Sequence, residues 1–158
     1  MRLHIITTSD TTSRERPHIR MCRQSAAEKP AFRDGWAAHR CAIPASWYYE
    51  WTHTLSSSGK LRTGDKYAVM PRDTKLTWLC GLYRMENGYP HFVVLTREPG
   101  ESVAFLHDRM PFILPAEKIR QWIDPNQNPH MLLSSALTDM IAERADGRGP
   151  QKPLVNSA

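Results

Sequence analysis

Through the centre of the chain, apolar and aromatic residues occur in short runs between polar stretches, which is the pattern of β-strands. Turn-forming residues separate the runs, and Asn87-Gly88 is a strong hairpin signal. The expected extended segments cover residues 41–44, 47–51, 66–70, 76–83 and 92–96.

Segments with the apolar spacing of helices precede and follow these strands in the sequence. Phe32 and Trp36 lie four residues apart after Pro30, which suits a first helical turn. Further helices are expected over residues 115–122 and 132–144. We therefore expect an α+β fold with a mostly antiparallel β core and a few flanking helices.

The chain divides into three parts. Residues 1–24 are basic and expected to be irregular, residues 25–145 form the domain, and residues 146–158 form a loose tail. With 158 residues, 41% of them hydrophobic, the chain can build one core. No apolar run approaches the roughly 20 residues of a membrane span, and no signal peptide is recognisable, so we expect a cytoplasmic protein without membrane contact.

The formal net charge is +5, and arginines gather in the first forty residues. This balance suits a partner with a phosphate backbone. On charge alone, it suits a basic protein without a nucleic-acid partner about equally well. The arginines concerned are Arg14, Arg16, Arg20, Arg23, Arg33 and Arg40.

The three cysteines, Cys22, Cys41 and Cys80, are far apart in sequence. Such spacing argues against a disulfide framework and against a cysteine-rich zinc site. Cys41 and Cys80 lie in apolar segments and are expected in the core. The seven histidines are scattered, so we expect neither a bound metal nor another cofactor.

Glu50 lies in an aromatic segment in which side chains are expected to alternate between two faces. Trp47, Tyr49 and Trp51 share one face, and Tyr48 and Glu50 share the other. A carboxylate in such surroundings is a candidate for partial burial, a raised pKa and acid–base chemistry. The local pattern alone favours the alternative, a glutamate that faces solvent.

His107 ends an irregular segment and is followed by Asp108 and Arg109. An imidazole can transfer protons near neutral pH, and a neighbouring carboxylate can orient it. A loop or core histidine with a satisfied hydrogen bond is the favoured alternative when this segment is taken by itself.

Two long motifs resemble one known family. Residues 40–51, R-C-A-I-P-A-S-W-Y-Y-E-W, resemble the R-C-L-I-P-A-x-G-[FY]-Y-E-W strand of the SOS-response-associated peptidase (SRAP) family of abasic-site processing proteins. Residues 106–114, L-H-D-R-M-P-F-I-L, are similar to its I-H-D-R-M-P-V-I-L motif. Shorter matches keep the family's order and spacing at residues 27–33, 80–83 and 94–96.

The resemblance covers roughly residues 25–123 and implies a barrel-like fold, here incomplete at the N-terminus. It also implies that Glu50 and His107 are the catalytic glutamate and histidine. In the family, a cysteine after the initiator methionine condenses with the aldehyde of an abasic site in single-stranded DNA and forms a thiazolidine cross-link. That cysteine is thought to be exposed by self-cleavage, and DNA binding would place the protein at the nucleoid.

The sequence departs from the family pattern near its start, where Arg2 stands in place of the cysteine. The family also has an N-A-R-x-E-T stretch, whereas the corresponding residues 18–25 contain no asparagine. From this segment Arg20 and Arg23, and from the second motif Arg109, are candidate DNA contacts.

Cys22 is a candidate nucleophile, although an internal cysteine has a thiol and no free amine. It could add to an aldehyde as a thiohemiacetal and could not form a thiazolidine. Three hypotheses follow for the chain, which we expect to be monomeric. It is an SRAP enzyme with impaired activity, an inactive homologue that binds single-stranded DNA, or the product of a gene fragment or mispredicted start.

Overall fold

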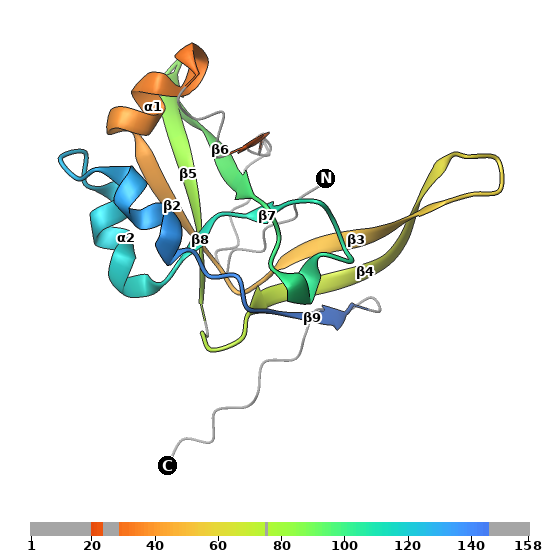
Figure 1. Cartoon of the computed structure of the whole chain (residues 1–158). Helices are drawn as coiled ribbons and strands as arrows, with labels where there is room; N and C mark the ends of the chain where they lie inside the picture. Colours follow the sequence, from red (N-terminus) through yellow and green to blue (C-terminus); the bar gives the residue numbers. More distant parts are fainter. Residues whose placement is uncertain (1–19, 24–28, 75, 146–158) are drawn as a thin grey trace.

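The computed structural model describes residues 20–23, 29–74 and 76–145, which form two β-sheets with two α-helices on one side of the larger sheet (Figure 1). The larger sheet has the strand order β1-β6-β5-β2, with short strands β7 on β6 and β8 on β5. These strands are β1 (Arg20–Arg23), β2 (Arg40–Ala45), β5 (Thr77–Glu86), β6 (Tyr89–Arg97), β7 (Met110–Pro111) and β8 (Ile113–Leu114).

The smaller sheet has the order β3-β4-β9. Its strands are β3 (Tyr48–Leu55), β4 (Leu61–Pro71) and β9 (Met140–Arg144). The hairpin of β3 and β4 projects from the body of the protein, and Leu55 pairs with Leu61 at its far end (Figure 1). This pairing continues both strands beyond the lengths expected from the sequence.

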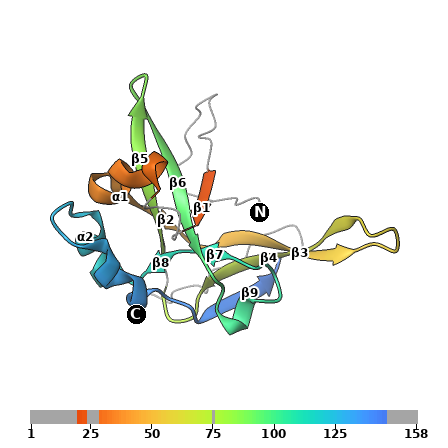
Figure 2. The ribbon, with the colours of Figure 1, turned by 45° about the horizontal axis from the view of Figure 1, so that its top comes forward.

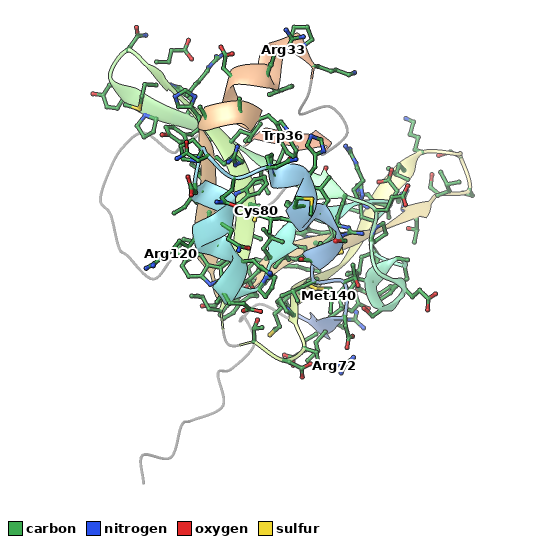
Figure 3. All side chains as sticks on the ribbon, turned by 60° about the vertical axis from the view of Figure 1, so that its left-hand side comes forward. Arg33, Trp36, Arg72, Cys80, Arg120 and Met140 are labelled. Atoms are coloured by element: carbon green, nitrogen blue, oxygen red, sulfur yellow. The ribbon has the colours of Figure 1, made fainter. Side chains whose placement is uncertain are left out.

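The helical segments are all short. They are η2 (Pro30–Phe32), α1 (Arg33–Ala38), η3 (Glu101–Val103), α2 (Ala116–Ile123) and η4 (Pro129–Ser135). Trp36 and Cys80 lie in the layer between the helices and the larger sheet, whereas Arg33 and Arg120 point outward (Figure 3). The expected α+β fold is confirmed, but in the described part of the chain the two sheets do not close into a barrel.

Strand β5 supplies side chains to two cores because alternate residues point to opposite faces. Cys80 and Leu82 pack under the helices with Trp36 and Trp122, and Leu79 packs on the other face, toward the smaller sheet. Between them, Gly81 admits no side chain, since a Cβ atom there would lie 2.5 Å from the Val93 carbonyl oxygen of β6.

Arg40, at the start of β2, ties the ends of the two α-helices to the sheet. Its side chain is buried and, within the described part of the chain, donates hydrogen bonds only to backbone carbonyls, which are the groups left unpaired at helix C-termini. The acceptors are Trp36 O at 2.6 Å, Ala37 O at 2.7 Å, Trp122 O at 2.6 Å, Gln127 O at 3.1 Å and Asp124 O.

Two sequence-based expectations differ from the structure. The helix expected over residues 132–144 is wrong, because the chain leaves a 3-10 turn and forms β9. Ile141 pairs with Met70 and Met140 with Pro71. Pairing to the edge of β4 therefore overrides the helical pattern of apolar residues that lie four positions apart. Residues 20–23, expected to be irregular, form β1, which runs parallel to β6 (Figure 2).

The remainder of the N-terminal segment up to residue 19, and the expected loose tail at 146–158, lie outside the described residues. Within the described part, no helix is both long enough and apolar enough to cross a bilayer.

Candidate active site

Glu50 is buried on the face of β3 that packs toward the larger sheet. Its neighbour on that face is Tyr48, and its cross-strand partner on β4 is Tyr67. Only 2% of Glu50 is exposed, so the solvent-facing alternative is wrong. The Trp51 N–H donates to Oε1 at 3.2 Å, and Oε2 is buried without a hydrogen-bond partner among the described residues. An unpaired buried oxygen of this kind is costly and suggests a function.

Burial raises the pKa of Glu50, and the negative charge of Asp108 raises it further, against the opposing effect of the Trp51 N–H bond. Burial, followed by the charge of Glu50, also raises the pKa of Tyr48, which holds that phenol protonated. The carboxyl group therefore takes up a proton more readily than an ordinary glutamate does.

The opposite face of β3 carries the aromatic residues expected there. Trp47 and Trp51 pack with Tyr49, and the Lys66 ammonium lies 3.6 Å from the centre of the Tyr49 ring. This contact is a cation–π interaction. The alternation deduced from the sequence is thus confirmed, and it separates the aromatic face from the face that carries Glu50.

His107 lies between η3 and β7, with 17% of its side chain exposed. Asp108 Oδ1 lies 2.5 Å from its Nδ1 atom, and the Arg109 N–H donates to the same nitrogen at 3.2 Å. These contacts favour opposite states, since Asp108 favours a protonated Nδ1 and Arg109 N–H favours a bare one. The shorter contact leads us to assign the proton to Nδ1, which leaves Nε2 with its lone pair in the neutral ring.

The pKa of His107 is lowered chiefly by burial, and the positive charges of His53 and Arg109 lower it further. Asp108 acts in the opposite direction. Near neutral pH these effects favour an uncharged imidazole that can accept a proton.

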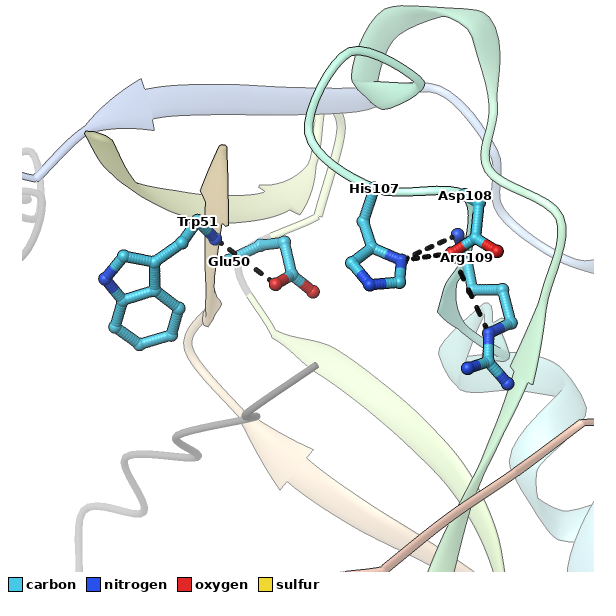
Figure 4. A network of polar contacts seen from close by, with 5 residues as sticks. All are labelled: Glu50, Trp51, His107, Asp108 and Arg109. Carbon is cyan, nitrogen blue, oxygen red and sulfur yellow. Dashed lines mark hydrogen bonds and ion pairs between the residues drawn. The ribbon is translucent and has the colours of Figure 1, made fainter. Parts of the chain in front are cut away.

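The Glu50 carboxyl and the His107 ring point toward one another from β3 and from the segment before β7 (Figure 4). One group has a raised pKa and the other a lowered pKa, as in sites where one residue donates a proton and another accepts one. Together they could protonate and deprotonate a small reacting group placed between them.

Two arginines with buried Nε atoms lie on or next to the β6–β7 pairing. The Nε atoms of Arg97 and Arg109 are buried without hydrogen-bond partners in the described part of the chain, and Arg109 Nε lies 4.0 Å from Asp108 Oδ1. Arg97 is on β6 and pairs with Met110, the residue after Arg109, so the two arginines come from adjacent backbone segments. No local pattern in the sequence pointed to Arg97, because it is the β6–β7 pairing that brings this residue next to Met110.

The other predicted residues lie on β1. Arg20, Cys22 and Arg23 belong to this strand, whose backbone pairs with residues 93–96 of β6. Their side chains are outside the described part of the structure, so their roles stay predictions.

The two described cysteines have unreactive surroundings. Cys80 is fully buried, and burial raises its pKa. Burial also raises the pKa of Cys41 to about 11, so this thiol stays protonated at neutral pH. Among the described residues, no three histidine, cysteine, aspartate or glutamate side chains gather as a metal site would require.

The chain is similar in sequence to proteins of one family. The family model of the SOS response associated peptidase (SRAP) matches residues 3–148. The abasic site processing protein YoaM of Bacillus subtilis is 36% identical over 120 residues, which are 72% of this chain and 51% of YoaM. The abasic site processing protein YoqW of Bacillus phage SPbeta is 34% identical over 139 residues, which are 85% of this chain and 59% of YoqW.

This chain therefore spans between half and three-fifths of the length of these two relatives. Among solved structures, a phage-related protein from Bordetella bronchiseptica has a similar fold, with a TM-score of 0.66 and 23% identity. The match covers 83% of this chain and 68% of that protein.

Proposed function

The chain belongs to the SOS response associated peptidase family, and from this premise we propose that it acts at abasic sites in DNA, with Glu50 and His107 as its proton-transfer pair. The observation that carries the proposal is the buried Glu50 carboxyl, whose Oε2 has no hydrogen-bond partner among the described residues, facing the His107 ring. The names of the relatives support the abasic site as the target.

The ring-opened sugar of an abasic site carries an aldehyde, and addition to an aldehyde needs protons at two places. The attacking group loses a proton, and the carbonyl oxygen gains one. His107 Nε2 would accept the first proton, and the protonated Glu50 carboxyl would supply the second. When the attacking group is an amine, the adduct loses water to form an imine, and the same acid protonates the departing hydroxyl; a thiol adduct stops at the thiohemiacetal. Reversal uses the same two groups in the opposite roles.

The DNA would be single-stranded, because the aldehyde must reach a carboxyl group that is 2% exposed. Arg109 and Arg97 would neutralise phosphates on either side of the reacting sugar, since guanidinium groups pair well with phosphate oxygens. The net charge of +5 favours the approach of a nucleic acid.

The nucleophile decides whether the complex is covalent. A covalent link would use a thiol or an amine, and the raised pKa of Cys41 and the burial of Cys80 disfavour both of these cysteines. Cys22 remains as the thiol to test. Self-cleavage, which the family resemblance implies, would require the same pair to act on a peptide carbonyl.

The second candidate function is non-covalent binding of single-stranded DNA. Arginine side chains and partly exposed aromatic residues such as Trp51 are typical of surfaces that bind single strands. Under this alternative, Glu50 and His107 would line the binding surface without transferring protons.

The deciding experiment incubates the full chain with an oligonucleotide that carries one abasic site and resolves the products on a denaturing gel. Covalent processing predicts a heat-stable shifted band that is lost in Glu50→Gln and His107→Ala. Glu143→Gln, which changes an exposed glutamate on neighbouring β9, serves as the matched control and should keep the band.

A thiohemiacetal formed by Cys22 alone reverses on heating, so a heat-stable band requires an attacking amine. Cys22→Ser tests whether the thiol contributes to that link, and a weaker band in this variant would show that it does. Native-gel binding without any heat-stable band would leave the non-covalent function in place. Absence of binding in both gels would overturn both proposals.

A further inference from the structure

His53 lies three residues after Glu50 on β3, and its ring packs against His107. The ring centres are 5.9 Å apart, and the ring planes meet at 82°, which is an edge-to-face contact. His53 is exposed, whereas His107 is largely covered, so His53 forms the outer wall of the His107 site.

Strict alternation along β3 would place His53 on the opposite face from Glu50. The β3–β4 ladder, however, shifts register here, because Trp51 pairs with Lys66 and His53 with Thr63. Two residues of β4 therefore oppose Thr52 alone, as in a β-bulge, which redirects side chains on the strands it joins. Gly64 permits this close approach, since a Cβ atom there would overlap the Thr52 hydroxyl.

The His107 ring is contacted by its own chain segment on one side and by β3 on the other. Asp108 and the Arg109 N–H meet Nδ1 from its own segment, and Glu50 and His53 face the ring from β3. Asp108 holds the ring at one atom only, so a second contact is needed to fix its plane. Among the described residues, His53 is the one that makes a ring contact with His107.

We propose that His53 is a positioning residue that holds the His107 ring in plane and, when it carries a proton, disfavours a second positive charge on His107. It would thereby help to keep His107 neutral as a base. The role of His53 in catalysis rests on the proposed function, whereas the coupling between the His53 and His107 rings does not.

The electrostatic surroundings agree with this geometry. Burial is the main cause that lowers the pKa of His107, and His53 contributes in the same direction, whereas Asp108 opposes it. Removing the charge at position 53 should therefore allow His107 to take up its proton at a higher pH.

The test is a histidine NMR titration of the full chain, in which loss of one signal in His107→Gln assigns the His107 resonance. His53→Phe keeps an aromatic ring and removes the titrating group. The His107 midpoint should rise by about half a pH unit, the size expected for two unit charges about 6 Å apart in water.

His53→Gln removes both the ring and the charge, so it should raise the midpoint similarly and weaken the conformational restraint on His107. The matched control is His39→Phe, because His39 is also exposed and packs edge-to-face on an aromatic ring, that of Tyr83, at 5.3 Å. It should leave His107 unchanged.

An unchanged His107 midpoint in both His53 variants would overturn the inference. A raised midpoint in a protein that does not act on abasic DNA would support the coupling of the rings and reject the proposed function, so the two failures can be distinguished.

Discussion

Asp108 holds His107 through its Oδ1 atom, 2.5 Å from Nδ1, although the two residues are adjacent in the chain. The contact occurs in an irregular segment between η3 and β7, where the backbone is free of the alternation that would direct neighbouring side chains to opposite faces. The carboxylate thus orients the imidazole and leaves Nε2 available on the side of Glu50.

Asp108→Asn should weaken this orientation while preserving the shape of the side chain. Because the negative charge of Asp108 raises the pKa of His107, its loss should lower the His107 midpoint. The same NMR titration measures the change. An unchanged midpoint would show that the carboxylate does not stabilise the imidazolium.

Glu50→Gln should change how stability depends on pH. The pKa of Glu50 is raised by burial, so the folded state binds a proton more tightly than the unfolded state. The wild-type protein should therefore lose stability as pH rises from the ordinary glutamate range through the raised pKa. The variant should lack this loss, so its stability relative to wild type should rise between pH 4 and pH 8.

Urea unfolding at both pH values measures this difference. Glu143→Gln, at an exposed position, should show the wild-type pH dependence. A parallel pH dependence in Glu50→Gln and wild type would contradict a raised pKa at Glu50.

Arg40→Lys should destabilise the protein by about 3 kcal/mol, because it leaves several buried carbonyl groups without the hydrogen-bond donors that the guanidinium supplies. The free energy of unfolding in urea is the measurement. Arg62→Lys, on the exposed part of the β3–β4 hairpin, is the matched control and should change stability little. Equal stability of the two variants would show that the Arg40 bonds contribute little.

Cys41 should react slowly with alkylating reagents. A thiol of pKa about 11 carries roughly two orders of magnitude less thiolate at pH 8 than a free cysteine. Mass spectrometry of iodoacetamide-treated Cys22→Ser protein measures the rate, which should rise about tenfold per pH unit between pH 8 and 10. Rapid labelling of Cys41 at pH 7 would contradict a protonated thiol.

Arg97→Ala and Arg109→Ala should each weaken binding of single-stranded DNA and reduce its salt dependence. Each lost phosphate contact should lower the slope of log affinity against log salt by about 0.7. Arg84→Ala removes an exposed arginine paired with Glu86 and should keep the slope. Fluorescence anisotropy across a salt series measures both quantities, and unchanged slopes for both site variants would remove them from the DNA contacts.

The sequence pattern predicted the faces of β3 correctly, since alternation depends only on neighbouring residues. It could not predict the burial of Glu50, which depends on the larger sheet and on the segment that carries His107. What pointed to this carboxyl was the resemblance of two motifs, far apart in the chain, to those of the SRAP family.

Long-range pairing explains the remaining differences. The apolar spacing around Leu137 and Ile141 is compatible with a helix, but the open edge of β4 supplies a partner for an extended chain. Likewise, the acceptors of Arg40 lie up to 87 residues away, so no local pattern could reveal the role of this arginine.

The bonds of Arg40 have a consequence for motion. They join the C-terminal end of α1 to the end of α2 and the turn after it, through one side chain anchored on β2. Neither helix can detach without releasing the guanidinium and exposing the carbonyls that it satisfies at the other helix. The amide protons of both helices should therefore exchange with solvent in a single cooperative opening, and the helical side of the sheet forms one unit of local unfolding.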